Sequence, residues 1–551
     1  MIALSGLAGC GGAPDAAKRS ASGADFTYQA QDYQAQGAGR PGGTLKVSAS
    51  ADTGSLDLHS ISHTNAQWLG RLIYDNLVYL DDQGRPTPWL AKSWDISPDG
   101  KTYTFHLRDD VTFSDGTPFD AEAVRVNLEH MRDPATKSPL AAAYIAPYRD
   151  GKVLDKHTFQ ARLSEPYTPF LDVLAQSWLA IESPKALKEN PKGFGEAPVG
   201  TGPFVVESYK RQQGIRLVRR ADYHWAPDFL RHDGPAYLER VEVDFLPEAL
   251  IRYSSLAGGQ YDLTIDAPPQ NAAAIRADRR LVFDSRIRKG NPNRGLTFNT
   301  ERFPFDDLRV RKAVALAIDR EGIARIAGFG EFLPKTDFLA ANTRYYDPSF
   351  QAPLRQDVAE ANRLLDEAGW TARDAQGFRV RDGQRLAAQM LVSEALTPSP
   401  GPVAIQADAR KVGVDLQLVQ LPTPQLADLR RAGKYQALAG GVWHTNTPDG
   451  LYILYHSNEI STARRIGQNS ARLRDARLDD ALAKARRSQS DDERRQLYRE
   501  AQQRLTELVP AVPLYENYSL TARHQRVKGV VYDTSHNTIV FTTVWLDKEA
   551  P

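Results

Sequence analysis

Two histidines near the start of the chain, His59 and His63, have a spacing suited to metal chemistry. Residues four apart share one face of an α-helix, and two imidazoles on one face can ligate a metal ion. The serines and threonine that flank these histidines favour a loop instead. We therefore expect no metal site, and a nickel or metal-complex site remains the minor alternative.

Motifs for catalysis are missing from the sequence. The chain contains no Gly-x-Ser-x-Gly nucleophile elbow, no His-Glu-x-x-His metal helix and no Gly-x-x-x-x-Gly-Lys phosphate loop. Pairs of catalytic carboxylates leave no local pattern, so a secreted hydrolase stays open as the weaker alternative. We expect a protein that is not an enzyme and that uses no cofactor.

The single cysteine, Cys10, follows Leu7, Ala8 and Gly9 after a mostly apolar stretch. This run resembles the lipobox of a bacterial lipoprotein precursor, in which the cysteine thiol is acylated and becomes the new N-terminus. Residues 11–41 are rich in small and polar residues, as in a flexible linker. We expect a protein held outside the cytoplasmic membrane by a lipid anchor, either on the cell surface or in the periplasm.

The composition of the chain bears on its partners and on its domain organisation. The 551 residues include 69 Lys plus Arg and 68 Asp plus Glu, for a net charge of +1. Such a balance gives no overall field that would attract nucleic acid. A single cysteine cannot form an internal disulfide, and the length suffices for several buried cores. We expect a multidomain protein with no nucleic-acid partner.

Alternating patterns predict strands that position these residues. Residues 44–48 alternate between apolar and polar side chains, as expected of a strand with one buried face. Residues 101–108 do the same after a Pro-Asp-Gly turn, and Tyr103, Phe105 and Leu107 share their apolar face.

Capping residues predict helices between the strands. Asp120 can cap one helix, Asp306 or Asp307 a second, and Gly369 can end a third. Residues 490–493 form a capping box, in which Ser and Glu side chains bind each other's backbone amides. Because strands and helices alternate along the chain, the predicted fold class is α/β.

Several runs of residues resemble one protein family, the extracytoplasmic solute-binding protein family 5, which includes the dipeptide, oligopeptide and nickel receptors of ABC importers. The matching runs are 90–119, 198–204, 221–225, 298–300, 304–313, 317–320, 364–370 and 413–414. We interpret the glycines and prolines of 198–204 as folding elements, because they impose a tight backbone path.

The resemblance implies a periplasmic-binding-protein-like fold of type II, with two lobes and an extra subdomain in the first. The ligand is then enclosed between the lobes. The implied domains are 1–10 (signal remnant with lipobox), 11–41 (linker), 42–297 (lobe I, with an inserted subdomain at about 52–180), 298–514 (lobe II) and 515–551 (return to lobe I).

The resemblance also implies a function: capture of a peptide or peptide-like solute and its delivery to an ABC permease and ATPase. The alternative solutes are an opine-like conjugate, an oligosaccharide or a nickel chelate. The family further implies a monomer.

Ligand contact in this family depends on a lobe II strand that corresponds to residues 440–449. In peptide receptors this strand supplies an aromatic residue and, three residues later, an aspartate that pairs with the peptide ammonium. Trp443 matches the aromatic residue, but Asn446 stands at the aspartate position. Either Asp449 takes over the role, or the ligand lacks a free amino terminus. His444 lies beside the aromatic position.

Other candidate contacts follow from the same resemblance. Tyr452 and Arg464 lie shortly after this strand, and arginine is a natural partner of a ligand carboxylate. In the first lobe, His59 and His63 lie in the loop that follows the first strand, where family members often touch the ligand.

Overall fold

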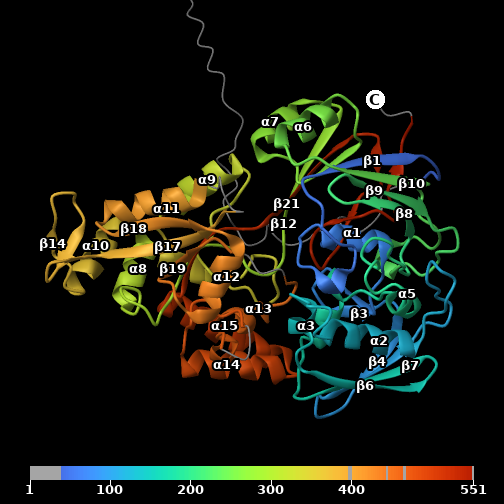
Figure 1. The fold of residues 1–551 in the computed structure, drawn as a ribbon, viewed down its shortest axis with the longest axis horizontal. Helices are drawn as coiled ribbons and strands as arrows, with labels where there is room; N and C mark the ends of the chain where they lie inside the picture. The colour runs from blue at the N-terminus through green and yellow to red at the C-terminus, as the bar shows by residue number, and fades with distance from the viewer. Residues whose placement is uncertain (1–38, 395–399, 442–444, 463–466, 549–551) are drawn as a thin grey trace, which may run out of the picture.

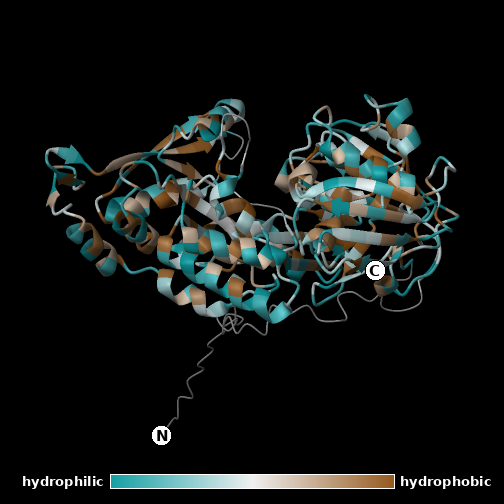
Figure 2. Cartoon of the chain, turned by 90° about the horizontal axis from the view of Figure 1, so that it is seen from below, coloured by the Kyte–Doolittle hydropathy of each residue, from teal (hydrophilic) through white to brown (hydrophobic). Residues whose placement is uncertain are grey.

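The computed structural model describes residues 39–394, 400–441, 445–462 and 467–548, which form two lobes (Figure 1). One lobe holds both ends of the described chain, and the other is built from the later middle portion. Apolar strands lie within both lobes, and hydrophilic segments lie toward the outside (Figure 2). None of the helices in the described ranges has the length and apolar character of a membrane span.

The first lobe is organised on a seven-stranded sheet with the order β12-β21-β11-β1-β10-β9-β8. Strand β1 is central, runs parallel to β10 and β11, and buries Leu45 and Val47 completely, which confirms the strand predicted at 44–48. The strands are β1 (Thr44–Ala49), β8 (Phe204–Lys210), β9 (Gly214–Arg219), β10 (Arg240–Phe245), β11 (Leu263–Ile265), β12 (Leu281–Ile287) and β21 (Tyr518–His524).

A four-stranded antiparallel sheet, β4-β5-β7-β6, forms a second layer in the first lobe. Tyr103, Phe105 and Leu107 of β5 are buried and alternate with partly exposed neighbours, as predicted. Helix α2 packs on β6 and β7, and Asp120 caps it by accepting from Ala123 N. The elements are β4 (Ala91–Ile96), β5 (Thr102–Leu107), β6 (Tyr148–Asp155), β7 (Thr158–Leu163) and α2 (Ala121–Arg132).

The second lobe is built on a five-stranded sheet with the order β18-β17-β19-β13-β20. Asp307 caps α8, and Gly369 follows α10 with a φ of 83°, a left-handed conformation that favours glycine. The strands are β13 (Asn293–Phe298), β17 (Ala387–Ser393), β18 (Asp415–Leu421), β19 (Ala437–Ala439) and β20 (Ala511–Tyr515). The helices are α8 (Leu308–Ala317), α9 (Arg320–Gly328), α10 (Val358–Glu367), α11 (Pro400–Lys411), α12 (Thr423–Ala432), α13 (Gly450–Tyr455), α14 (Ala476–Arg487) and α15 (Asp491–Leu508).

Shorter elements complete both lobes. The helices are α1 (Ala66–Ile73), α3 (Ala141–Tyr144), α4 (Phe170–Leu174), α5 (Pro184–Glu189), α6 (Ala249–Ala257), α7 (Ala272–Ala277), η2 (Leu58–Ser60), η3 (Ser177–Leu179), η4 (Asp228–Leu230), η5 (Pro269–Asn271), η6 (Pro348–Leu354) and η8 (Ser457–Glu459). The strands are β2 (Val78–Leu80), β3 (Pro86–Pro88), β14 (Ala372–Arg373), β15 (Arg379–Arg381), β16 (Gln384–Arg385), β22 (Val527–Lys528), β23 (Val531–Tyr532), β24 (Ile539–Val540) and β25 (Trp545–Leu546).

The predicted capping box at the start of α15 forms only in part. Ser490 Oγ accepts from Glu493 N at 3.3 Å, as predicted. The return bond from Glu493 to Ser490 N does not form, because the hydroxyl of Ser488 lies between them. Ser488 accepts from Ser490 N at 3.2 Å and donates to Glu493 Oε2 at 2.5 Å.

The glycines of 198–204 make close backbone contacts, which confirms their interpretation as folding elements. A Cβ on Gly200 would lie 2.1 Å from Ile73 O, and one on Gly202 would lie 2.5 Å from Ile73 C. Gly202 N donates to Ile73 O at 2.9 Å. The turn is therefore held against the C-terminal end of α1.

Two segments connect the sheets of the two lobes. The chain leaves the first sheet after Ile287 and enters the second at Asn293, and it returns between Tyr515 and Tyr518. The domain boundaries expected at 298 and 515 remain predictions.

Candidate functional site

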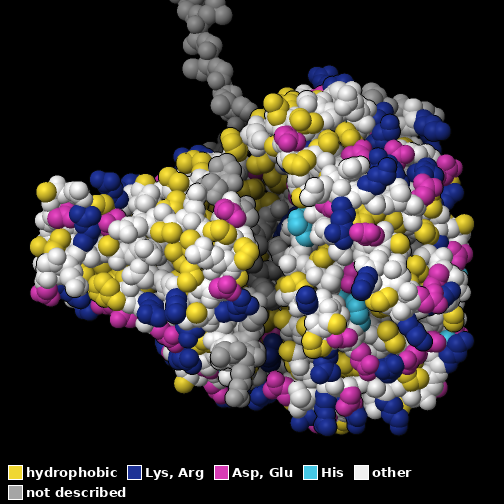
Figure 3. Space-filling model, in the orientation of Figure 1, with side chains coloured by type: hydrophobic (Ala, Val, Ile, Leu, Met, Phe, Trp, Pro, Cys, Tyr) yellow, Lys and Arg dark blue, Asp and Glu magenta, His cyan; other side chains and the backbone are white. Residues whose placement is uncertain are grey.

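A cavity of about 350 Å³ lies where the connecting segments run between the lobes. A groove separates the two lobes on the surface as well (Figure 3). The cavity is lined by Thr64, Gln67, Asp266, Arg288, Lys289, Phe332, Tyr515, Glu516, Asn517, Tyr518 and His536. Both lobes and both connecting segments therefore contribute to one site.

Arg288 supplies a positive charge to the cavity wall. Its Nη1 donates to Gln67 Oε1 at 2.6 Å, its Nε donates to Tyr518 O at 3.2 Å, and its Nη2 lies 3.9 Å from Asp266 Oδ1. Burial lowers the pKa of Arg288, and the charge of Asp266 partly offsets this. Because arginine has a pKa far above neutrality, the group stays cationic and can bind an anion.

Glu516 supplies a negative charge to the same wall. Its Oε1 accepts from Ala341 N at 2.9 Å and lies 3.1 Å from Lys335 Nζ. Its Oε2 is buried and has no hydrogen-bond partner within the described part of the chain. A buried acceptor without a partner is costly, so Oε2 is well suited to accept an N–H group of a ligand.

An aromatic stack forms another part of the cavity wall. The Phe332 ring lies 5.0 Å from that of Tyr518, at an interplanar angle of 5°, and 5.2 Å from that of Tyr515. Stacked rings offer an apolar surface beside the charged groups. The cavity thus combines a cation, carboxylates and aromatic rings, which suits a small solute with charged and apolar parts.

The predicted histidines of the first lobe lie in different environments. His63 precedes the cavity residue Thr64, and its Nδ1 accepts from Asn65 N at 3.1 Å. Burial lowers the pKa of His63, against the opposing effect of Asp266. His59 is fully buried and does not line the cavity, since its Nδ1 lies 2.9 Å from His130 Nδ1. His59 is therefore paired with His130, and not with His63 as in the minor alternative of a metal ion shared by His59 and His63.

The predicted residues of the second lobe lie at a contact between the lobes. Asn446 Nδ2 donates to Asp172 O at 2.8 Å, and Asn446 Oδ1 is buried without a hydrogen-bond partner in the described ranges. Both oxygens of Asp449 accept from Arg486, at 2.8 Å each, and Tyr167 donates to Asp449 Oδ2 at 3.1 Å.

Tyr452 belongs to the same contact. The guanidinium carbon of Arg486 lies 3.6 Å from the centre of the Tyr452 ring. The ligand role of Tyr452 remains a prediction, as do those of Asn446 and Asp449. Trp443, His444, Arg464 and Cys10 lie outside the described residues.

None of the residues that line the cavity was among the ligand residues predicted from the sequence. Arg288 and Glu516 lie more than 200 positions apart and meet only because both connecting segments pass between the lobes. The one feature of the sequence that pointed toward the cavity was the expected return of the chain to lobe I near Tyr515, because Tyr515 is itself a cavity residue.

Comparisons with known proteins agree with this architecture. A family profile described as "Bacterial extracellular solute-binding proteins, family 5 Middle" matches residues 85–462. The nickel-binding periplasmic protein of Escherichia coli is 27% identical over 473 residues, covering 84% of this chain and 87% of that protein. The di/tripeptide-binding protein 3 of Pseudomonas aeruginosa is 29% identical over 479 residues, covering 80% and 83%.

A solved structure extends the comparison over the whole fold. The ABC transporter-associated periplasmic binding protein DppA of Helicobacter pylori, in complex with peptide STSA, superposes with a TM-score of 0.75 and 28% identity. The match covers 92% of this chain and 99% of that one. With a profile match over more than half of its length, the chain belongs to the bacterial extracellular solute-binding proteins of family 5.

Proposed function

We propose that this protein captures a peptide or peptide-like solute with a free carboxylate in the cavity between its lobes and delivers it to an ABC permease with its ATPase. The main support for this proposal is the cavity, because Arg288, Glu516 and the aromatic stack all line it. The peptide STSA bound to the similar Helicobacter pylori protein supports the choice of solute class.

Arg288 is the group proposed to bind the solute carboxylate. A guanidinium forms charge-assisted hydrogen bonds to a carboxylate, and these are about twice as strong as neutral ones. Glu516 Oε2 is proposed to accept from a solute N–H group or ammonium. A peptide carries both kinds of group, whereas a neutral oligosaccharide carries no carboxylate.

Asp449 is left out of the proposed set of ligand residues. Its two oxygens already accept from Arg486 and Tyr167, and the side chain is almost fully buried. Asn446 is kept, because its Oδ1 is a buried acceptor that a solute N–H group can satisfy.

A thermal-shift panel tests the proposal, since a solute that binds only the folded state raises the melting temperature. The panel contains a tetrapeptide with free termini, its C-terminal amide, its N-acetyl form, an opine, an oligosaccharide and nickel–histidine complexes. The free tetrapeptide is expected to raise the melting temperature more than its C-terminal amide does. A shift caused only by the oligosaccharide or by nickel complexes would refute a peptide-like, carboxylate-bearing solute.

Binding without turnover is also part of the proposal, because family 5 proteins are non-enzymatic binding proteins. The tetrapeptide is expected to be recovered intact after incubation with the protein, as checked by mass spectrometry. Cleavage products that depend on the protein would instead support the hydrolase alternative.

We propose that the protein is a monomer and that a lipid attached to Cys10 anchors it to the membrane. Multiple acyl chains hold a protein stably at a membrane, whereas one chain gives only marginal binding. Replacing Cys10 by Ser is expected to move the expressed protein from the membrane fraction to the soluble extracytoplasmic fraction. An unchanged distribution would remove the anchor from the proposal.

A further inference from the structure

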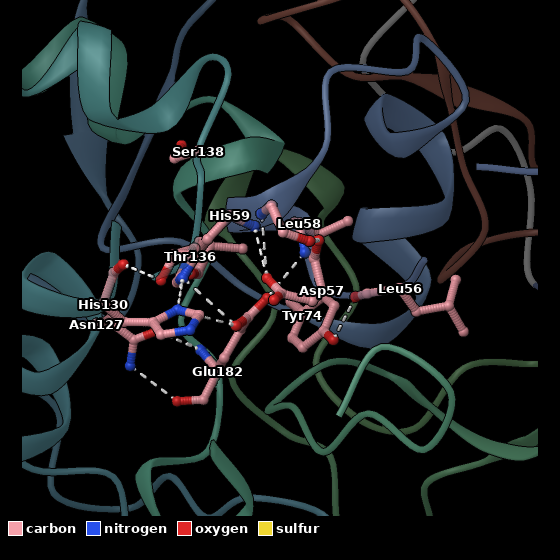
Figure 4. Close-up of polar contacts among 12 residues, drawn as sticks. Leu56, Asp57, Leu58, His59, Tyr74, Asn127, His130, Thr136, Ser138 and Glu182 are labelled. Carbon is pink, nitrogen blue, oxygen red and sulfur yellow. Dashed lines mark hydrogen bonds and ion pairs between the residues drawn. The ribbon is translucent and has the colours of Figure 1, made fainter. Parts of the chain in front are cut away.

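Four side chains of metal-ligand type gather inside the first lobe, away from the cavity between the lobes (Figure 4). Asp57 precedes η2, His59 lies in η2, His130 lies near the end of α2, and Glu182 follows η3. One ligand atom from each residue lies within 4.8 Å of the ligand atoms of the others. Three separate chain segments therefore converge on one point.

The distances among three of the four ligand atoms, those of His59, His130 and Glu182, suit a small tetrahedral ion. His59 Nδ1 lies 2.9 Å from His130 Nδ1 and 3.4 Å from Glu182 Oε2, and His130 Nδ1 lies 4.0 Å from Glu182 Oε2. Zinc bound by nitrogen and oxygen at about 2.0–2.2 Å sets its tetrahedral ligands about 3.3–3.5 Å apart. Shifts of about half an ångström or less bring all three observed distances into that range.

Backbone groups hold the ligands so that their free atoms point at this centre. His59 Nε2 lies 2.9 Å from Ala180 O, so Nε2 carries the proton and Nδ1 offers its lone pair. Glu182 Oε1 accepts from Leu58 N at 2.9 Å, which turns Oε2 inward. Orientation of each ligand by a hydrogen bond from its far side is typical of metal sites.

The side chain of Asn127 fixes the backbone of Glu182 relative to His130. Asn127 lies three residues before His130 on α2, so the two side chains share a helix face. Asn127 Oδ1 accepts from Glu182 N, and Asn127 Nδ2 donates to Glu182 O, both at 2.8 Å. These two bonds therefore hold the Glu182 backbone against α2.

Glu182 Oε2 gives an independent sign of a ligand. Glu182 is fully buried, and its Oε2 has no hydrogen-bond partner among the described residues.

We propose that Asp57, His59, His130 and Glu182 bind a divalent transition metal, with Zn²⁺ as the ion of choice for two imidazoles and two carboxylates. The two carboxylates balance the charge of the ion. Four protein ligands fill a tetrahedral shell, as in structural sites. The ion ties η2 to α2 and to the Glu182 segment, and η2 leads directly to the cavity residue Thr64.

The competing arrangement is a hydrogen bond between the two imidazoles. At 2.9 Å, one Nδ1 can donate to the other. That bond leaves Glu182 Oε2 without a hydrogen-bond partner, whereas a metal ion would bind it directly. The metal-bound arrangement and the hydrogen-bonded arrangement therefore predict different effects of a substitution at Glu182.

The test is titration of the full chain with ZnCl₂ by calorimetry and with CoCl₂ by absorption, after chelator treatment and removal of the chelator. The variants are His130→Gln, Glu182→Gln and, as a matched control, His106→Gln, which changes a histidine on β5 whose side chain is 43% exposed. Because the His130 side chain is 24% exposed, His130→Gln is the variant expected to fold normally.

The wild type and His106→Gln are expected to bind one Zn²⁺ and to give the intense Co²⁺ bands of a tetrahedral site. His130→Gln and Glu182→Gln are expected to weaken Zn²⁺ binding by about 100-fold or more, beyond the 10–100-fold effect of outer-shell partners. No stoichiometric binding by the wild type, or equal binding by wild type and His130→Gln, would overturn the proposal. The peptide members of the solute panel contain no metal, so failure of this site leaves the proposed capture of a peptide untouched.

Discussion

At the scale of single residues, Arg288 is the group on which solute recognition is proposed to depend. Arg288→Gln removes its charge and is expected to weaken binding of the free tetrapeptide by about 10–100-fold, since hydrogen bonds to charged groups contribute about 1.5–3 kcal/mol. Binding of the C-terminal amide should change little. Calorimetry of both peptides measures the difference, with Arg474→Gln, an exposed arginine of the second lobe, as the control. Equal losses for both peptides would contradict carboxylate binding by Arg288.

Asn446 is predicted to determine the response to a free amino terminus. Asn446→Asp places a carboxylate where a solute ammonium can pair with it, so the preference for the free tetrapeptide over its N-acetyl form is expected to rise about 10-fold or more.

The same change removes the donor to Asp172 O and brings two acceptors together, so the unliganded protein should lose about 1–3 kcal/mol of stability. Calorimetry and thermal unfolding measure the two effects. Asn458→Asp changes an exposed amide and serves as the control. An unchanged preference between the two peptides would remove Asn446 from the ligand site.

The candidate site could be predicted from sequence only where a local run carried the resemblance. The run 440–449 pointed to Asn446 and Asp449, and the structure places both at the contact between the lobes. Arg288 and Glu516 were not predicted, because a charged residue in a connecting segment has no local pattern that distinguishes it from a surface residue.

At the scale of elements, the pair of Asp449 and Arg486 joins the start of α13 to the end of α14. Asp449→Asn breaks a buried ion pair and leaves Arg486 without its counter-charge, which costs about 3–5 kcal/mol. Asp480→Asn breaks the exposed pair with Lys484 on the same helix and should cost less than about 1 kcal/mol. Urea unfolding of the two variants measures the contrast, and similar losses would contradict a structural role for Asp449.

Asp75, just after α1, makes stability depend on pH. Burial raises its pKa to about 6, against the opposing hydrogen bonds from Trp225 and Tyr223. Between the ordinary pKa of 3.8 and about 6, the folded state binds more protons than the unfolded state does. The free energy of unfolding therefore falls as pH rises through this window, by about 3 kcal/mol from this group.

Asp75→Asn cannot ionise and is expected to lose this dependence. Its stability relative to the wild type should rise by about 2.4 kcal/mol between pH 4 and pH 7.5. Urea unfolding at both pH values measures the change, and any constant effect of the substitution cancels in the comparison. Asp233→Asn, at an exposed position, should show no such rise. A parallel pH dependence of Asp75→Asn and wild type would contradict the account.

Elements were predictable where a few neighbouring residues determine them. The alternation in β5 and the caps at Asp120 and Asp307 need only local contacts, and the structure confirms all three. The capping box at Ser490 formed only in part, because the hydroxyl of Ser488 competes for the same groups. The convergence of η2, α2 and Glu182 depends on packing between distant segments, which local patterns do not reveal.

At the scale of the whole molecule, the lobes touch along one edge in addition to their two connecting segments. Thr168 N and Oγ1 both donate to Arg486 O, at 2.8 and 2.7 Å, and Arg487 pairs with Glu165 at 2.7 Å. Such contacts can form and break as the lobes move, since relative motion is the default for lobes joined by short segments. A solute that touches both lobes is expected to shift the population toward the closed form.

The most direct test of a receptor that closes on its solute is small-angle scattering of the full chain, with and without saturating amounts of the peptide that gives the largest thermal shift. With peptide, the wild type is expected to show a smaller radius of gyration, and Arg288→Gln is expected to show a smaller decrease than the wild type at the same peptide concentration. An unchanged radius in the wild type under conditions where calorimetry shows full occupancy would contradict enclosure of the solute between the lobes.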